Sequence, residues 1–121
     1  TAGTILPVKG FEPCHFNVSP KLESSGNQRH ARMRPRVLTY FASLERAVFK
    51  FVVTSIGDFE EVDDLVKMFD IPKNKVYIMP EGVEPSKLLK TQMLVADSVI
   101  KRGYRLTTRL HILLWGNERG R

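Results

Sequence analysis

The sequence predicts an α/β fold with a mostly parallel sheet, in which crossover helices connect the strands. Two observations support this fold class. Short runs rich in β-branched and aromatic residues alternate with longer amphipathic runs, and the distances between them are typical of strand–helix–strand units. The chain has 121 residues, a length that favours a single domain, residues 1–121, with a modest core.

Five segments are predicted to be strands. The run AVFKFVV is β-branched and aromatic, which is typical of a buried strand. TILPV, HFNV and KVYIM are shorter extended candidates, and RLHILLW is the last apolar run of the chain. The predicted strands cover residues 4–8, 15–18, 48–53, 75–79 and 109–115.

Three amphipathic runs are predicted to be helices. Pro35 suits the first turn of one helix, and Gly103 is a typical stop signal for another. In DFEEVDDLVKMF, Asp58 is placed to cap the helix with Glu61 three residues later, as in a capping box. The predicted helices cover residues 36–46, 58–69 and 85–102, and residues 23–34 are predicted to form a polar, mobile loop.

The composition excludes several classes of protein. No apolar run approaches the roughly 20 residues that a membrane-spanning helix needs. Cys14 is the only cysteine and the three histidines lack metal-ligand spacing, so neither an internal disulfide nor a metal site is expected. A single cysteine fits a reducing compartment, and we expect a cytoplasmic location.

The net charge of +6 at pH 7 is unevenly distributed. Basic residues gather in 21–50 and 101–121, and acidic residues gather in DFEEVDD. A basic surface can bind nucleic acid or a small anionic ligand, although a solvated face is the commoner reason for such charge. Nucleic acid is therefore not an expected partner, and a small basic nucleic-acid-binding protein stays the last alternative.

Two short motifs fall at the carboxyl ends of predicted strands, where parallel α/β proteins bind their ligands. In Ser19-Pro20-Lys21, the hydroxyl and the flexible cation suit a carboxylate, a ribose or a phosphate. In Met79-Pro80-Glu81, the first two residues can present apolar surface to a flat ring and the carboxylate can accept hydrogen bonds. Each motif taken alone is more often an ordinary turn than a binding site.

Four segments occur in a set order: TAGT, VSPKL, YIMPEG and LHILLWGNERGR, with FKFVV between the second and the third. Together they resemble the C-terminal part of the 7-carboxy-7-deazaguanine synthases, radical S-adenosylmethionine enzymes of the queuosine and 7-deazapurine pathway. The resemblance spans nearly the whole chain. Each motif alone is weak, and their order and spacing make the match specific.

The resemblance implies a fold, a reaction and cofactors. The fold is a partial (β/α) barrel, of which this chain would be the C-terminal portion. A [4Fe-4S] cluster reduces S-adenosylmethionine, and the 5′-deoxyadenosyl radical abstracts hydrogen from 6-carboxy-5,6,7,8-tetrahydropterin. Ring contraction and loss of nitrogen then give 7-carboxy-7-deazaguanine, with Mg²⁺ assisting.

The resemblance also implies roles for particular residues. The first motif would border the S-adenosylmethionine pocket, the second would contact the ribose and the amino-acid part, and the third would lie near the adenine. The implied cofactor-binding residues are Thr1, Gly3, Thr4, Ser19, Lys21, Met79, Pro80 and Glu81. His111 and the tail after it would close the side that binds the pterin substrate.

The sequence departs from the family in one large respect. The three cysteines that bind the cluster in the family lie in an N-terminal region that this sequence lacks, and Cys14 cannot replace them. We therefore expect a domain cut within a strand or one half of a split protein, inactive without an N-terminal half or partner chain. We expect an exposed sheet edge or an exposed apolar face near Thr1–Val8, where the missing half would dock. A non-catalytic nucleoside- or S-adenosylmethionine-binding module and a homodimer remain alternatives.

Overall fold

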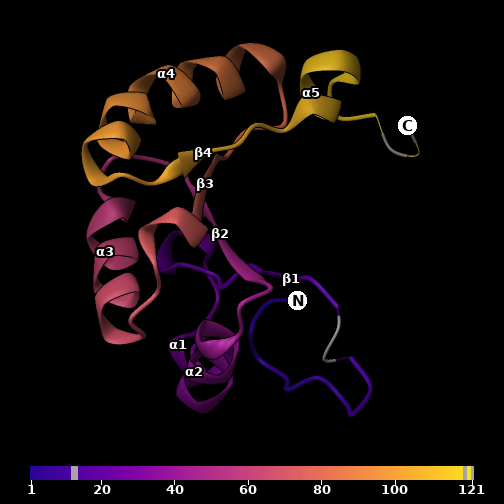
Figure 1. The fold of residues 1–121 in the computed structure, drawn as a ribbon. Coiled ribbons are helices and arrows are strands. Elements are labelled where there is room, and N and C mark those ends of the chain that lie inside the picture. Colours follow the sequence, from indigo (N-terminus) through magenta and orange to yellow (C-terminus); the bar gives the residue numbers. More distant parts are fainter. Residues whose placement is uncertain (12–13, 119, 121) are drawn as a thin grey trace.

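Four parallel strands form one sheet within residues 1–11, 14–118 and 120, which the computed structural model describes. The strands follow one another across the sheet in the order in which they occur along the chain (Figure 1). This arrangement confirms the predicted α/β fold with a parallel sheet and matches part of a (β/α) barrel. The strands are β1 (Phe16–Val18), β2 (Ala47–Val53), β3 (Val76–Pro80) and β4 (Arg105–Leu106).

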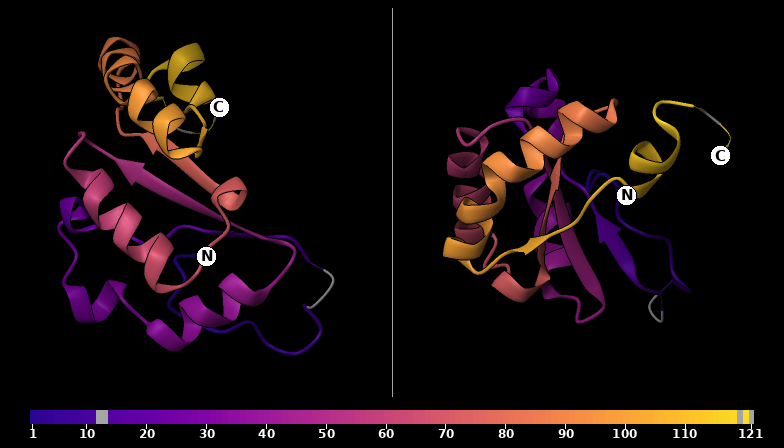
Figure 2. Two further views of the ribbon diagram at one scale, coloured as in Figure 1. Left: turned by 60° about the vertical axis from the view of Figure 1, so that its left-hand side comes forward. Right: turned by 90° about the horizontal axis from the view of Figure 1, so that it is seen from above.

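Helices connect consecutive strands and gather on one face of the sheet. Parallel crossovers have a fixed hand, so strands in sequential order send their helices to the same side. Helices α3 and α4 lie on that side, whereas the first residues of the chain and α5 lie on the other (Figures 1 and 2). The helices are α1 (Arg29–Arg32), α2 (Pro35–Ser43), α3 (Asp58–Met68), α4 (Pro85–Arg102) and α5 (Leu110–Trp115), with 3-10 turns at Glu23–Ser25 and Lys73–Lys75.

The core lies between the sheet and these helices. Along β2, Phe49 and Phe51 are buried, while Val48, Lys50 and Val52 are only half-buried. This alternation shows that one face of the strand packs in the core and the other is more open. Full burial of an aromatic side chain contributes roughly 1.5–3 kcal/mol to folding, so the phenylalanines of β2 are a main source of stability.

The prediction of a strand at residues 4–8 is wrong. The segment is irregular and lies at the surface, with Ile5 76% and Val8 71% exposed. Gly3 (φ +71°) and Gly10 (φ +100°) adopt left-handed backbone on either side of it, and Pro7 has no amide hydrogen to donate. No strand within the described ranges pairs with this segment, and β-branched composition alone does not make a strand.

The prediction of a strand at residues 109–115 is also wrong, because Leu110–Trp115 forms α5 and the fourth strand is Arg105–Leu106. A short apolar run cannot be assigned to helix or strand from its periodicity alone. The ladder ends where Thr107 donates its amide hydrogen to the Ile78 carbonyl at 2.9 Å. The chain then turns away from the sheet.

The other predicted elements are confirmed to within one residue at most ends, except that α2 ends at Ser43 rather than at residue 46. The capping box at the start of α3 does not form. Asp58 accepts hydrogen bonds from Thr54 instead, and Glu61 pairs with Arg32. The segment 23–34, predicted as a loop, contains α1 and is fastened to α3 by this buried arginine.

None of the helices in the described ranges combines the length and the apolar character needed to cross a bilayer. The longest of these helices is α4, with 18 residues. Polar and charged residues interrupt its apolar positions, including the lysines at 87, 90 and 101. Its buried side chains form a stripe toward the sheet, as in an amphipathic surface helix.

Replacement of a core phenylalanine tests the packing of β2. We expect Phe51→Ala to lower the free energy of unfolding by about 3–5 kcal/mol, because it opens a cavity among buried groups. The control is Val52→Ala, the next residue on the opposite, half-buried face, for which about 1 kcal/mol is expected. Urea unfolding measures both values, and equal losses would contradict the two-faced strand.

Candidate functional site

A row of polar side chains crosses the sheet on the face that the helices leave uncovered. The alternation that buries Phe49 and Phe51 turns Lys50 to this face. Lys50 pairs in register with Tyr77 on β3, and Tyr77 pairs with Arg105 on β4. Neighbouring strands lie about 4.8 Å apart, so these three residues, which we call the open-face row, stand side by side.

Two members of the open-face row, Lys50 and Arg105, are positively charged. Arg105 donates a hydrogen bond from Nη1 to the hydroxyl of Tyr77 at 3.1 Å, and its guanidinium carbon lies 5.6 Å from the centre of the Tyr77 ring. Lys50 is half-buried. Within the described part of the chain, neither Lys50 nor Arg105 forms an ion pair.

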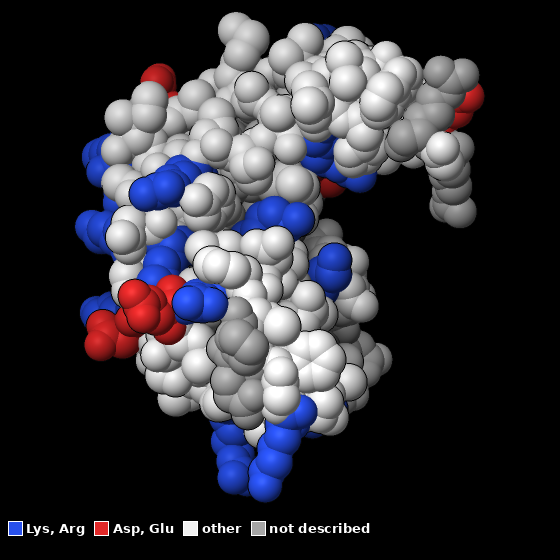
Figure 3. Space-filling view, turned by 45° about the vertical axis from the view of Figure 1, so that its right-hand side comes forward, with Lys and Arg blue, Asp and Glu red and all other residues white. Residues whose placement is uncertain are grey.

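A pocket of about 370 Å³ lies over this face of the sheet. On this side of the molecule, Figure 3 shows a hollow with Lys and Arg side chains along its walls and a small acidic area at its upper rim. The electrostatic character of the hollow is therefore basic. The pocket is lined by Asn17, Val48, Lys50, Tyr77, Met79 and Thr107.

Ser19 extends the row to the outer edge of the sheet. Its Oγ donates a hydrogen bond to the Lys50 carbonyl at 2.9 Å. The Ser19 amide donates to the Thr1 carbonyl at 2.7 Å, and the Thr1 amino group donates to the Asn17 carbonyl at 3.0 Å. These last two bonds are the pair that a residue of a parallel strand makes with its neighbour. Two predicted site residues, Thr1 and Ser19, thus lie together.

Gly3 and Thr4 border this edge, and Gly3 is buried for a steric reason. A Cβ atom at Gly3 would lie 2.7 Å from Leu38 Cδ2 and 3.0 Å from Val18 Cγ1, and the residue has a φ of +71°. The Gly3 amide donates to Thr1 Oγ1 at 3.2 Å. Gly3 therefore lets the first residues approach the core, and Thr4 follows it half-buried.

A smaller pocket, of about 170 Å³, connects the turn after β1 with the segment after β3. Lys21 and Glu81 both line this pocket. Lys21 is exposed, whereas Glu81 pairs with Lys87 at 3.4 Å. Pro80 is buried at the end of β3, and Met79 belongs to the larger pocket.

His111 lies apart from the sheet, because it belongs to helix α5. The sequence predicts a strand at residues 109–115, which would have placed His111 in the sheet. His111 is exposed in the first turn of α5 and lines neither of these two pockets. Arg109, the residue before α5, does contact the strand-end loops. It donates a hydrogen bond from Nη1 to the Gly82 carbonyl at 2.7 Å and so connects α5 to the loop after β3. Arg119 and Arg121, in the predicted tail, lie outside the described residues.

Sequence reasoning did not identify Lys50, Tyr77 and Arg105 as site residues. A signal for Lys50 was present, because a lysine between Phe49 and Phe51 must face away from a core that holds both rings. The same alternation applies to Tyr77 in KVYIM. Arg105 carried no such signal, since the last strand was predicted four residues further on.

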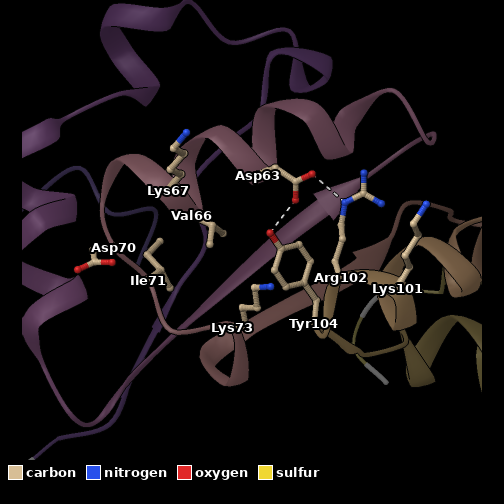
Figure 4. A pocket seen from close by; sticks show the side chains of 9 residues that line it. All are labelled: Asp63, Val66, Lys67, Asp70, Ile71, Lys73, Lys101, Arg102 and Tyr104. Atoms are coloured by element: carbon tan, nitrogen blue, oxygen red, sulfur yellow. Dashed lines mark hydrogen bonds and ion pairs between the residues drawn. The ribbon is translucent and has the colours of Figure 1, made fainter.

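The largest of the described pockets, about 610 Å³, lies at the amino ends of β3 and β4, away from the carboxyl-end loops. Figure 4 shows Asp63 between Arg102 and Tyr104: its carboxylate accepts from Arg102 Nε at 2.8 Å and from the Tyr104 hydroxyl at 2.6 Å. The Arg102 guanidinium also lies 4.7 Å from the centre of the Phe59 ring. Basic residues at the ends of α3 and α4 balance the negative helix termini, so we interpret this network as structural.

The described residues offer little for a metal ion. Among them, no group of three His, Cys, Asp or Glu side chains is placed to hold one. Cys14 is exposed, and it is the only cysteine of the sequence. Because iron–sulfur clusters are held by several thiolates, this chain does not supply such a ligand set by itself.

The fold and the open face define a segment of a (β/α) barrel with a basic inner surface. No family model matches the chain. The chain is, however, 34% identical over 123 residues to the 7-carboxy-7-deazaguanine synthase of Pyrobaculum aerophilum, which covers 100% of this chain and 53% of that protein. It is homologous to the 7-carboxy-7-deazaguanine synthases, which confirms the resemblance seen in its motifs.

Other relatives of the same name give a similar result. The protein from Rhodopirellula baltica is 32% identical over 132 residues, covering 99% of this chain and 51% of that protein. The protein from Hyperthermus butylicus is 32% identical over 87 residues, covering 69% of this chain and 37% of that protein. The chain thus spans about half the length, or less, of the curated relatives that it matches.

The Asp63–Tyr104 hydrogen bond predicts a dependence of stability on pH. Burial first, and then the hydrogen bond and charge of Asp63, raise the pKa of Tyr104 above its ordinary value of 10.0. A raised folded-state pKa gives stabilisation that is complete below the unfolded value and is lost as the pH rises above it. We therefore expect Tyr104→Phe to be less stable than wild type at about pH 8, with a difference that shrinks by about pH 11.

Urea midpoints across this pH range measure the effect. Tyr40→Phe serves as the control, because Tyr40 is a half-buried tyrosine on α2 that forms no bond with Asp63. A difference between wild type and Tyr104→Phe that stays constant up to about pH 11 would contradict the assignment.

Proposed function

We propose that the chain is the C-terminal part of a 7-carboxy-7-deazaguanine synthase, an enzyme that converts 6-carboxy-5,6,7,8-tetrahydropterin to 7-carboxy-7-deazaguanine by radical S-adenosylmethionine chemistry. The observation that supports this most is an alignment with a protein of that name over 100% of the chain. The basic hollow on the inner face of the sheet also fits ligands that carry carboxylates.

The residues at the carboxyl ends of the strands fit the binding of S-adenosylmethionine. The Ser19 hydroxyl donates to a backbone carbonyl and keeps its lone pairs to accept from a ligand. Lys21 can reach an anionic group in the pocket that it shares with Glu81. When bound beside a reduced iron–sulfur cluster, S-adenosylmethionine supplies the radical that abstracts hydrogen from the substrate. This chain's residues would hold and orient it.

The iron–sulfur cluster does not fit this chain's described residues, because it would need thiolates beyond Cys14. For Mg²⁺, no group of three His, Cys, Asp or Glu side chains is gathered in the described ranges. We therefore assign no step through either group to this chain. In the proposed enzyme these ligands come from additional polypeptide, to which the chain contributes the inner wall of the site.

The outer edge of β1 is where such a polypeptide would join. Thr1 forms the two hydrogen bonds of a parallel strand with β1. A segment of polypeptide that leads into Thr1 would therefore extend a parallel strand along that edge. Exposed apolar side chains lie beside it, including Ile5, Val8 and Phe11, which is 49% exposed. Their pocket, of about 270 Å³, reaches the buried ring of Phe41. This surface supports the proposal of a docked N-terminal half.

A non-catalytic module that binds a nucleoside or S-adenosylmethionine is the main alternative. It would use the same strand-end residues, Ser19 and Lys21, but would need no cluster. The two functions differ in the polypeptide that the edge of β1 receives. A segment with three clustered cysteines supports the enzyme, whereas a start codon directly before Thr1 supports the module.

Reconstitution tests the proposed enzyme. The chain alone and the chain extended by the residues encoded directly upstream are loaded anaerobically with iron and sulfide. Both are then given S-adenosylmethionine, a reductant and 6-carboxy-5,6,7,8-tetrahydropterin, and the product is measured by mass spectrometry. We expect 7-carboxy-7-deazaguanine only from the extended protein. An extended protein that binds a cluster and yields no product would contradict the proposal.

Replacement of Lys21 tests the cofactor site in the extended protein. Lys21→Ala is expected to weaken S-adenosylmethionine binding by roughly 1.5–3 kcal/mol, the range for a hydrogen bond to a charged group. The folding stability should change by less than about 0.5 kcal/mol, because the side chain is exposed. Lys21→Arg should rescue binding only in part, since a planar guanidinium replaces a compact ammonium.

Calorimetric titration measures the affinity for S-adenosylmethionine, and thermal melts measure the folding stability. Lys90→Ala, an exposed lysine on α4, is the matched control and should bind the cofactor as wild type does. Unchanged affinity in Lys21→Ala would show that the turn after β1 is an ordinary surface turn and not part of the cofactor site.

A further inference from the structure

We propose that the open-face row is a carboxylate clamp, in which Lys50 and Arg105 hold one carboxylate over Tyr77. The inference rests on the proposed function and assigns a role to three residues that the family resemblance left without one.

The register brings the two cations within reach of one small anion. Lys50 and Arg105 flank Tyr77 on neighbouring strands, so their Cα atoms are two strand spacings apart, roughly 10 Å. Both side chains are long enough to cover half of that distance and rise above the sheet. A carboxylate above the Tyr77 ring would therefore meet an ammonium from one side and a guanidinium from the other.

The hydrogen bonds leave the row ready to donate. The Tyr77 hydroxyl accepts from Arg105 Nη1 at 3.1 Å, so its own hydrogen is free for a ligand. The same bond and the ring contact restrain the guanidinium, whose remaining hydrogens suit a carboxylate in a forked arrangement. The row thus offers three kinds of donor and no carboxylate of its own.

The burial of Lys50 favours an external anion. Lysine is seldom removed from water without a partner, yet Lys50 is half-buried in the middle of β2 and has no ion pair among the residues described. An isolated cation near a low-dielectric wall attracts anions more strongly than one in open water. Met79 and Val48 in the same pocket provide apolar surface for a flat ring beside the carboxylate.

Two ligands of the proposed enzyme carry a carboxylate, namely the pterin substrate and the amino-acid part of S-adenosylmethionine. Two pairs of probes distinguish them. In the first pair, 6-carboxypterin is compared with pterin, which lacks the carboxylate. In the second, S-adenosylhomocysteine is compared with 5′-methylthioadenosine, which lacks the amino acid. Fluorescence or calorimetric titration of the chain gives the affinity for each.

We expect wild type to bind the carboxylate-bearing member of one pair at least tenfold more tightly than its partner. Lys50→Met and Arg105→Met should each reduce that preference about tenfold, in line with loss of a charged hydrogen bond. Lys50→Arg should keep most of it, and Tyr77→Phe should reduce it by less than either methionine variant. Lys90→Met, on the helix side of the sheet, is the matched control and should leave the preference unchanged.

A ligand change tests the clamp without any change in the protein. The methyl ester of 6-carboxypterin has lost the charge and should bind wild type no better than pterin does. Equal affinities within both probe pairs would overturn the clamp, and so would a preference that survives in folded Lys50→Met and Arg105→Met.

These results separate the clamp from the proposed function. If the extended protein forms product while both methionine variants keep the carboxylate preference, the clamp is wrong and the enzyme assignment stands. If wild type shows the preference and both variants lose it while the extended protein yields no product, the clamp stands and the enzyme assignment fails.

Discussion

The structure depends on one constraint: an all-parallel sheet whose strands follow in chain order receives its helices on a single face. Parallel sheets are usually covered on both faces. Here the helices bury Phe49, Phe51 and their neighbours, and the opposite face keeps half-buried side chains that include Lys50 and Tyr77. A fully two-sided core would have no place for a lysine in the middle of β2. The one-sided cover is therefore what permits a polar site on this sheet.

The same constraint leaves the outer edge of the sheet open. The β1 strand has three residues and the β4 strand has two, so both outer strands are short, as is common where a sheet must avoid uncontrolled pairing. The ladder bonds of Thr1 nevertheless show that the edge of β1 accepts a parallel neighbour. The curated relatives are about twice as long as this chain. The open edge of β1 is a place where the additional residues of such a protein could pair with the sheet.

Much of the fold could be predicted from the sequence, and the failures have physical causes. The strand at 47–53 and the helices α3 and α4 carry strong periodicity and stop signals, which tertiary packing reinforces. The runs at 4–8 and 109–115 are apolar and short, so only the presence or absence of a neighbouring strand could decide them. The strand-end residues Ser19 and Lys21 were predicted from position. The open-face row was not, because it exists only through a register that joins residues 50, 77 and 105.

The α5 helix carries the residue that dominates the intrinsic fluorescence of the protein. Trp115, the last residue of α5, is the only tryptophan of the sequence and is 44% exposed. A helix of six residues is too short to persist in water without packing, so the surroundings of the indole follow the docking of this segment. The wavelength of its fluorescence emission consequently reports on the surroundings of α5, which lies on the opposite side of the sheet from α3 (Figure 1). A shift of that emission to shorter wavelength marks the moment at which another surface covers α5.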